Sequence, residues 1–223
     1  MEVNKILLDS LSYPFSDNKK YFKLLILFLT SFLVIPGIMA CGYLVRIIKY
    51  TTHGKSERPD FNDWKELLKD GLKLLGLGII FAVVFYGLLW IINLLLNIYP
   101  VFNDTSILII KVVYTILVNS LFIMSLAHMA HEGRFVAGFD FKKIIGLIAK
   151  TGWVKYLALI TIFTIFAELL SQIIVIGAYL PIFTGIWRII SYLVLSLLVF
   201  TYLFTYESRF TGLIYPKNTA VTS

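Results

Sequence analysis

The chain has 223 residues, of which 59% are hydrophobic and only 15% charged, and its mean hydropathy is +0.85. This composition excludes an ordinary soluble domain and indicates a single membrane domain over residues 1–223. The net charge of +7 does not favour a nucleic-acid partner, because the basic residues gather in loops between apolar stretches. That placement instead fits a surface facing a lipid bilayer with anionic headgroups.

Residues 1–17 form the first predicted element, an amphipathic segment at the membrane interface. Apolar residues recur at helical spacing from Val3 to Leu11, and charged residues occupy the other side. Pro14 ends this short helix, since proline is not tolerated in a helix interior.

The stretch 21–50 is the first predicted span, with a break at Pro36-Gly37. A single kinked crossing is the first expectation, because each half alone is too short to span a hydrocarbon core of about 30 Å. This threading places the N-terminus outside. The alternative is a re-entrant segment that bends at Pro36-Gly37 and keeps the N-terminus cytoplasmic.

Four further apolar stretches are long enough to cross a bilayer and carry very few charges. Small residues in the first of them, Gly76, Gly78, Ala82 and Gly87, predict close packing against neighbouring helices. The predicted spans are 72–98, 107–130, 153–180 and 187–206, followed by a tail at 207–223.

The basic residues alternate along the chain in a way that predicts the threading of these spans. Lys and Arg are frequent in 46–73, in 129–155 and after residue 207, whereas the turns 99–106 and 178–187 hold none. Basic loops stay in the cytoplasm, so the chain is expected in the cell membrane with a cytoplasmic C-terminus and external short turns.

An internal repeat predicts two cytoplasmic elbow helices, at 63–71 and 140–151. Each begins with an aspartate at the expected N-cap, has one apolar face and leads into a span. A shorter echo, Glu-x-Arg-Phe, occurs at 132–135 and 207–210. The apolar elbow faces consist of Trp64, Leu67 and Leu68 in the first helix and Phe141, Ile144 and Ile145 in the second.

Polar residues inside the spans are the only candidate site. Glu168 lies near the middle of the fourth span, with Gln172 one turn later on the same face. Asn119 and Asn93 lie at comparable depth in other spans. One interpretation is a proton- or cation-sensitive position on a translocation path, and the other, which we favour, is a protonated carboxyl that joins helices by hydrogen bonds.

The histidines allow a second kind of site to be considered. His128, His131 and Glu132 lie close in sequence, and with His53 they could form a metal site, but the spacing matches no zinc motif. Ordinary hydrogen bonding is therefore the favoured interpretation, and no cofactor is predicted. No catalytic set of residues stands out, so the chain is not expected to be an enzyme.

Several short motifs stand out in the chain, most of them before Gly71: Tyr13-Pro14-Phe15-Ser16-Asp17, Ile35-Pro36-Gly37, Gly42-Tyr43, Arg46, Pro59-Asp60-Phe61-Asn62-Asp63-Trp64 and Asp70-Gly71. These motifs resemble those of the mainly archaeal membrane family catalogued as domain of unknown function 4013. The resemblance implies a multi-span membrane protein and supplies no activity, cofactor or catalytic residue.

The sequence thus predicts an all-α, polytopic integral membrane helical bundle with about five transmembrane helices and two cytoplasmic amphipathic elbow helices. The leading functional hypothesis is a non-enzymatic, transport-related or membrane-complex component that assembles with itself or with a cytoplasmic protein through the elbows. The competing hypothesis is a lipid-binding or membrane-organising scaffold whose elbows contact anionic headgroups.

Overall fold

The computed structural model describes residues 3–98, 104–180 and 184–216, and all regular structure in these ranges is helical. The all-α prediction is therefore confirmed. The predicted turns at 99–106 and 178–187 and the tail at 207–223 lie partly outside the described residues. The elements are α1 (Val3–Ser12), η1 (Tyr13–Phe15), α2 (Asn18–Leu29), η2 (Ser31–Leu33), α3 (Ile35–Thr52), α4 (Trp64–Ile98), α5 (Asp104–Glu132), η3 (Phe135–Phe139), α6 (Phe141–Thr151), α7 (Trp153–Ala178) and α8 (Ile186–Ile214).

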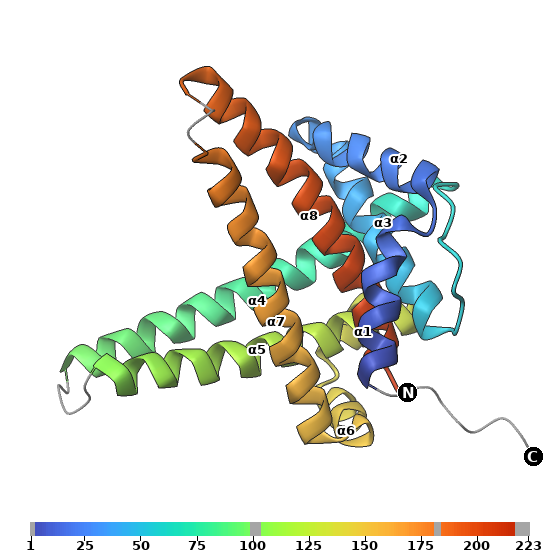
Figure 1. Ribbon diagram of the computed structural model, residues 1–223. Helices are drawn as coiled ribbons and strands as arrows, with labels where there is room; N and C mark the ends of the chain where they lie inside the picture. The colour runs from blue at the N-terminus through green and yellow to red at the C-terminus, as the bar shows by residue number, and fades with distance from the viewer. Residues whose placement is uncertain (1–2, 99–103, 181–183, 217–223) are drawn as a thin grey trace, which may run out of the picture.

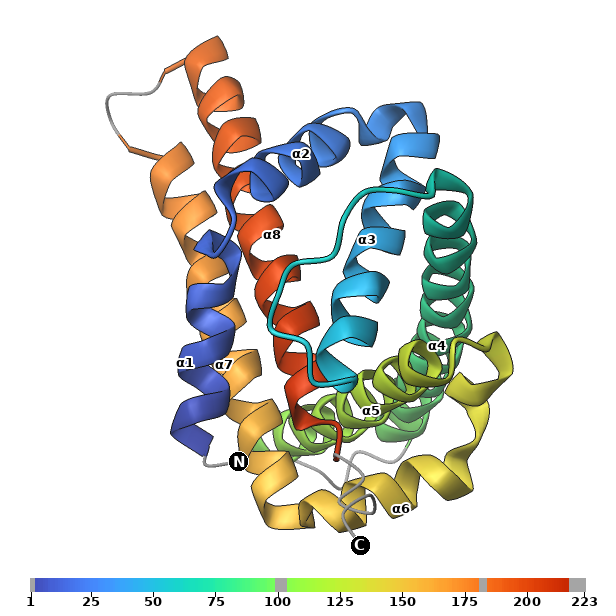
Figure 2. The same cartoon turned by 90° about the vertical axis from the view of Figure 1, so that its right-hand side faces the viewer.

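Two long helical hairpins diverge from a shared base, α4 with α5 and α7 with α8 (Figure 1). The shorter helices α1, α2 and α6 lie around this base, as the view turned by 90° also shows (Figure 2). Helix α3 lies at the centre, where it contacts α2, α4, α5 and α8. The base is therefore the packed core of the molecule, whereas the hairpins expose long apolar surfaces.

The helices α4, α5, α7 and α8 are long and apolar enough to cross a membrane. They overlap the four predicted spans at 72–98, 107–130, 153–180 and 187–206, but α8 continues to Ile214, into the predicted tail. The first elbow is not a separate helix, because α4 runs without interruption from Trp64 to Ile98. The second elbow is separate, as expected: α6 ends at Gly152, whose φ of 91° is accessible to glycine at little cost.

The structure differs from the five-span expectation at the N-terminal stretch 21–50. This stretch forms two helices, α2 and α3, and neither is among the four candidate spans. The break falls at Thr30–Val34, just before Pro36, which occupies the first turn of α3. Proline is tolerated there because the first turn has no intrahelical partner for its missing N–H group.

Contacts at the start of α2 bear on the choice between a single crossing and a re-entrant segment. Lys20 Nζ donates to the Arg58 carbonyl oxygen at 2.8 Å and pairs with the Asp60 carboxylate at 2.8 Å. Both ends of the α2–α3 unit thus meet the basic loop 53–63, and the exposed apolar residues 32–35 form its tip. The start of α2 thus lies beside that loop, which the re-entrant alternative requires.

Cysteine labelling tests this placement in a Cys41→Ala background. We expect Lys19→Cys and Glu57→Cys to be equally protected from an impermeant thiol reagent added to intact cells, because residues 20 and 60 are in direct contact. Thr184→Cys, in a turn expected to be external, should react. Outside labelling of Lys19→Cys but not of Glu57→Cys would contradict the re-entrant arrangement.

Candidate functional site

Glu168 and Gln172 form a polar pair on the outer face of α7. Gln172 Nε2 donates to Glu168 Oε1 at 2.9 Å, and both side chains are exposed. The exposed residues beside them are apolar, with Ile165 56% and Leu169 64% accessible. The carboxyl group therefore faces outward from this chain, near the middle of a helix suited to a membrane.

The two predicted asparagines do not join this pair. Asn119 Nδ2 on α5 donates to Thr164 Oγ1 on α7 at 3.4 Å, one turn before Glu168. Asn93 Nδ2 donates to the Leu89 carbonyl oxygen of its own helix at 2.9 Å. The structure thus links α5 to α7 through Asn119 and Thr164, without Glu168, and it does not gather the four residues into one site.

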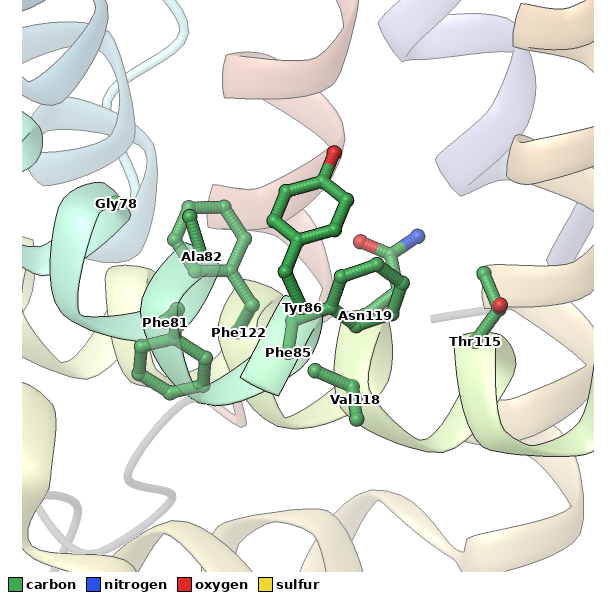
Figure 3. A pocket seen from close by; sticks show the side chains of 9 residues that line it. All are labelled: Gly78, Phe81, Ala82, Phe85, Tyr86, Thr115, Val118, Asn119 and Phe122. Carbon is green, nitrogen blue, oxygen red and sulfur yellow. The ribbon is translucent and has the colours of Figure 1, made fainter. Parts of the chain in front are cut away.

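Asn119 also borders a hollow of about 280 Å³ between α4 and α5. Figure 3 shows aromatic rings around this hollow, with the Tyr86 hydroxyl pointing away from the Asn119 amide. Its remaining polar group is the Thr115 hydroxyl, which donates to the Lys111 carbonyl oxygen of the same helix. Such a surface packs apolar groups and offers little to a polar ligand. The lining residues are Gly78, Phe81, Ala82, Phe85, Tyr86, Thr115, Val118, Asn119 and Phe122.

A buried arginine at the base was not identified as a candidate from the sequence. Arg209 on α8 donates from Nε and Nη2 to the Asp9 carboxylate on α1, at 2.7 and 3.1 Å. Its Nη1 donates to Thr51 Oγ1 at 3.2 Å and to the Lys55 carbonyl oxygen at 2.9 Å. With only 3% of its surface accessible, Arg209 joins α1, α3 and α8.

A second buried arginine ties the N-terminal segment to the loop 53–63. Arg58 donates to the Pro14 carbonyl oxygen at 2.8 Å and to the Asp17 carbonyl oxygen at 3.3 Å. The Tyr13 ring lies between the two guanidinium groups, 5.2 Å from Arg58 and 4.8 Å from Arg209. Burial raises the pKa of Tyr13 to about 12, against the opposing pull of both arginines, so its hydroxyl stays neutral.

The two elbows have matching environments. Asp63 Oδ1 accepts from the Glu66 amide at 3.3 Å and Asp140 Oδ1 from the Lys143 amide at 3.2 Å, which confirms both predicted N-caps. Two of the three equivalent positions also share their burial. Leu67 and Ile144 are fully buried, Trp64 and Phe141 are exposed, Leu68 is half-buried and Ile145 is exposed.

The histidines gather near the end of α8. His128 Nδ1 lies 3.0 Å from the Tyr215 hydroxyl, and the His53 and His131 rings stack at 4.6 Å. Among the described residues, no group of three or more His, Cys, Asp or Glu side chains is placed to hold a metal ion.

Comparison with known proteins gives a family. A family model described as protein of unknown function (DUF4013) matches residues 25–182. The uncharacterised protein MJ0233 of Methanocaldococcus jannaschii is 28% identical over 150 residues, which cover 65% of this chain and 52% of that protein. The matched region thus spans about half of the relative's length. No solved structure matches the chain.

Proposed function

The chain belongs to the DUF4013 family and is a multi-pass membrane protein, and we propose that it is a membrane-complex component that assembles with a second copy of itself. The observation that carries this proposal is the outward-facing Glu168–Gln172 pair on α7. A charged carboxyl in the middle of a lipid-facing helix costs about 2.5–3.5 kcal/mol, so a covered position is favoured.

A second copy is the occupant that best complements this pair. After the bond between them, Gln172 keeps a free N–H donor and its carbonyl acceptor, and the Glu168 carboxyl keeps further acceptor capacity. Two such pairs facing each other across a two-fold axis can exchange donors and acceptors reciprocally. The apolar neighbours Ile165 and Leu169 then pack at the same interface.

The elbows fit the membrane-organising part of this role. Trp64 and Phe141 are exposed at equivalent positions, beside Lys65 and Lys142. Exposed aromatic rings next to lysines suit the headgroup layer, where the rings enter the apolar boundary and the ammonium groups meet anionic lipids. The elbows would thus hold the base of the assembly at the cytoplasmic surface.

Crosslinking in native membranes tests the assembly. In a Cys41→Ala background, Leu169→Cys should form a disulfide-linked dimer on mild oxidation, since a residue beside a two-fold axis meets its own copy. Val83→Cys is the matched control, because it is equally exposed but lies on the other hairpin. Adding Glu168→Leu and Gln172→Leu should weaken association about tenfold, because two reciprocal hydrogen bonds are lost at about 0.6 kcal/mol each.

Two substitutions of Glu168, first by glutamine and then by cysteine, distinguish assembly from transport. The amide keeps a donor and an acceptor, so the dimer should persist. Equal crosslinking at Leu169→Cys and Val83→Cys, or a monomeric mass by light scattering in mild detergent, would refute the assembly. Reaction of Glu168→Cys with an impermeant thiol reagent would instead favour a water-filled path and the transport hypothesis.

A further inference from the structure

A cavity of about 220 Å³ lies at the base, where α2, α3, α4, α5 and α8 meet. Its walls are mainly apolar and include Phe28, Phe122 and Phe204. Three polar side chains of α8 also line it, Glu207, Ser208 and Thr211. The cavity therefore combines an apolar enclosure with a few polar groups on one side, which is the usual character of a small-molecule site.

Two of these polar groups have no partner within the described part of the chain. No hydrogen bond or ion pair joins the half-buried Glu207 side chain to another described group, and the Thr211 hydroxyl is buried without a hydrogen-bond partner. Ser208 differs, because its hydroxyl donates to the Phe204 carbonyl oxygen at 2.7 Å. Glu207 and Thr211 lie one helical turn apart and so present two acceptors on the same face of α8.

The nearest arginine in sequence does not neutralise Glu207. Every nitrogen of the Arg209 guanidinium donates to Asp9, Thr51 or Lys55, on the side of α8 that faces α1 and α3. A carboxyl group in apolar surroundings is unfavourable unless it is paired or hydrogen-bonded. A suitable partner for the Glu207 carboxyl is thus a small hydrogen-bond donor group, preferably one with a positive charge.

We propose that this cavity binds a small apolar amine, with its ammonium group between Glu207 and Thr211 and its apolar body among the aromatic side chains. An ammonium group has three donors and no acceptor, which suits a carboxylate and a hydroxyl one turn apart. The cavity is larger than a site of about 150 Å³, which holds a benzene ring, and smaller than the smallest drug-sized sites, which measure about 300 Å³. A ligand with about eight carbon atoms matches this size.

Cys41 provides a direct reporter of occupancy. It is the single cysteine of the chain, and it lines the cavity. We would measure its alkylation by N-ethylmaleimide in nanodiscs with n-octylamine, n-octanol or n-octanoate, three probes of equal length. Octylamine at ten times its dissociation constant should slow alkylation about tenfold, as mass action requires. Octanoate should leave the rate unchanged, because its carboxylate meets that of Glu207.

Variants separate specific binding from a general effect of amphiphiles. Glu207→Gln should abolish protection by octylamine, measured against the alkylation rate of the same variant without a probe, and Thr211→Val should weaken this protection. A Cys41→Ala, Val136→Cys variant, with its cysteine on an exposed residue outside the cavity, should show no protection. If Glu207→Gln does not fold, the three probes on the unmodified chain still decide whether the cavity binds the amine in preference to the alcohol and the acid. Equal protection by amine and acid, greater protection by octanol, or none by any probe would overturn the proposal.

Discussion

Replacing Gly71 by alanine is expected to drive α3 away from α4 and to lower the folded yield sharply. A Cβ atom at Gly71 would overlap the Ile38 carbonyl oxygen, and one at Gly42 would overlap the Leu67 carbonyl oxygen. Backbone oxygens cannot turn aside as a side chain can, so the helices themselves must separate. We expect a loss of more than about 3 kcal/mol, at or above the upper end for an overpacked core.

Thermal unfolding in mild detergent, with size-exclusion chromatography for folded yield, measures this effect. Gly78→Ala is the matched control on the same helix, because nothing lies within 4 Å of a Cβ atom placed there. Alanine favours a helix over glycine by about 1 kcal/mol, so this variant should be neutral or slightly more stable. Equal stability of the two variants would show that α3 and α4 do not cross at their glycines.

The features that local sequence patterns specify could be predicted. Long apolar runs predict α4, α5, α7 and α8 because a membrane helix must satisfy its backbone internally over about 20 residues. The elbow caps at Asp63 and Asp140 could be predicted as well, because a cap involves only the next three residues. The paired burial of Leu67 and Ile144 follows from the same repeat.

The features that depend on distant residues could not be predicted. Pro36 was recognised as a break, but a proline does not reveal whether the chain continues onward or turns back. Gly78 and Gly87 are expected to allow close packing, but no described atom lies within 4 Å of a Cβ atom placed at either position. The close crossing uses Gly42 and Gly71, and both belong to the motifs that carry the family resemblance.

The candidate site shows the same limit. The bond between Gln172 and Glu168 follows from their spacing of one turn, and the structure contains it. The proximity of Asn119 to Thr164 depends on how α5 and α7 pack, which the sequence pattern leaves open. Glu207 and Arg209 belong to a recognised echo, yet their different roles arise because they face opposite sides of α8.

Removal of the Asp9 carboxylate is expected to destabilise the base strongly, because it leaves Arg209 buried without its counter-ion. Breaking a buried pair in this way costs about 3–5 kcal/mol. The Asp9 side chain is 34% exposed, so water can partly replace it, and we expect about 2–4 kcal/mol for Asp9→Ala. The free energy of unfolding in detergent measures this loss, and faster tryptic cleavage at Lys5 should accompany release of α1.

Two further variants decide whether the loss of stability comes from the unpaired charge of Arg209. The double variant Asp9→Leu, Arg209→Met should recover much of the lost stability, because it removes the stranded charge and leaves apolar side chains of similar length. Glu132→Ala breaks the exposed pair with Arg134, at 3.2 Å, and should cost less than about 1 kcal/mol. If Asp9→Ala costs no more than Glu132→Ala, Arg209 does not hold α1 to α8 through this ion pair. If the double variant is no more stable than Asp9→Ala, the loss comes from packing around the aspartate and not from an unpaired arginine.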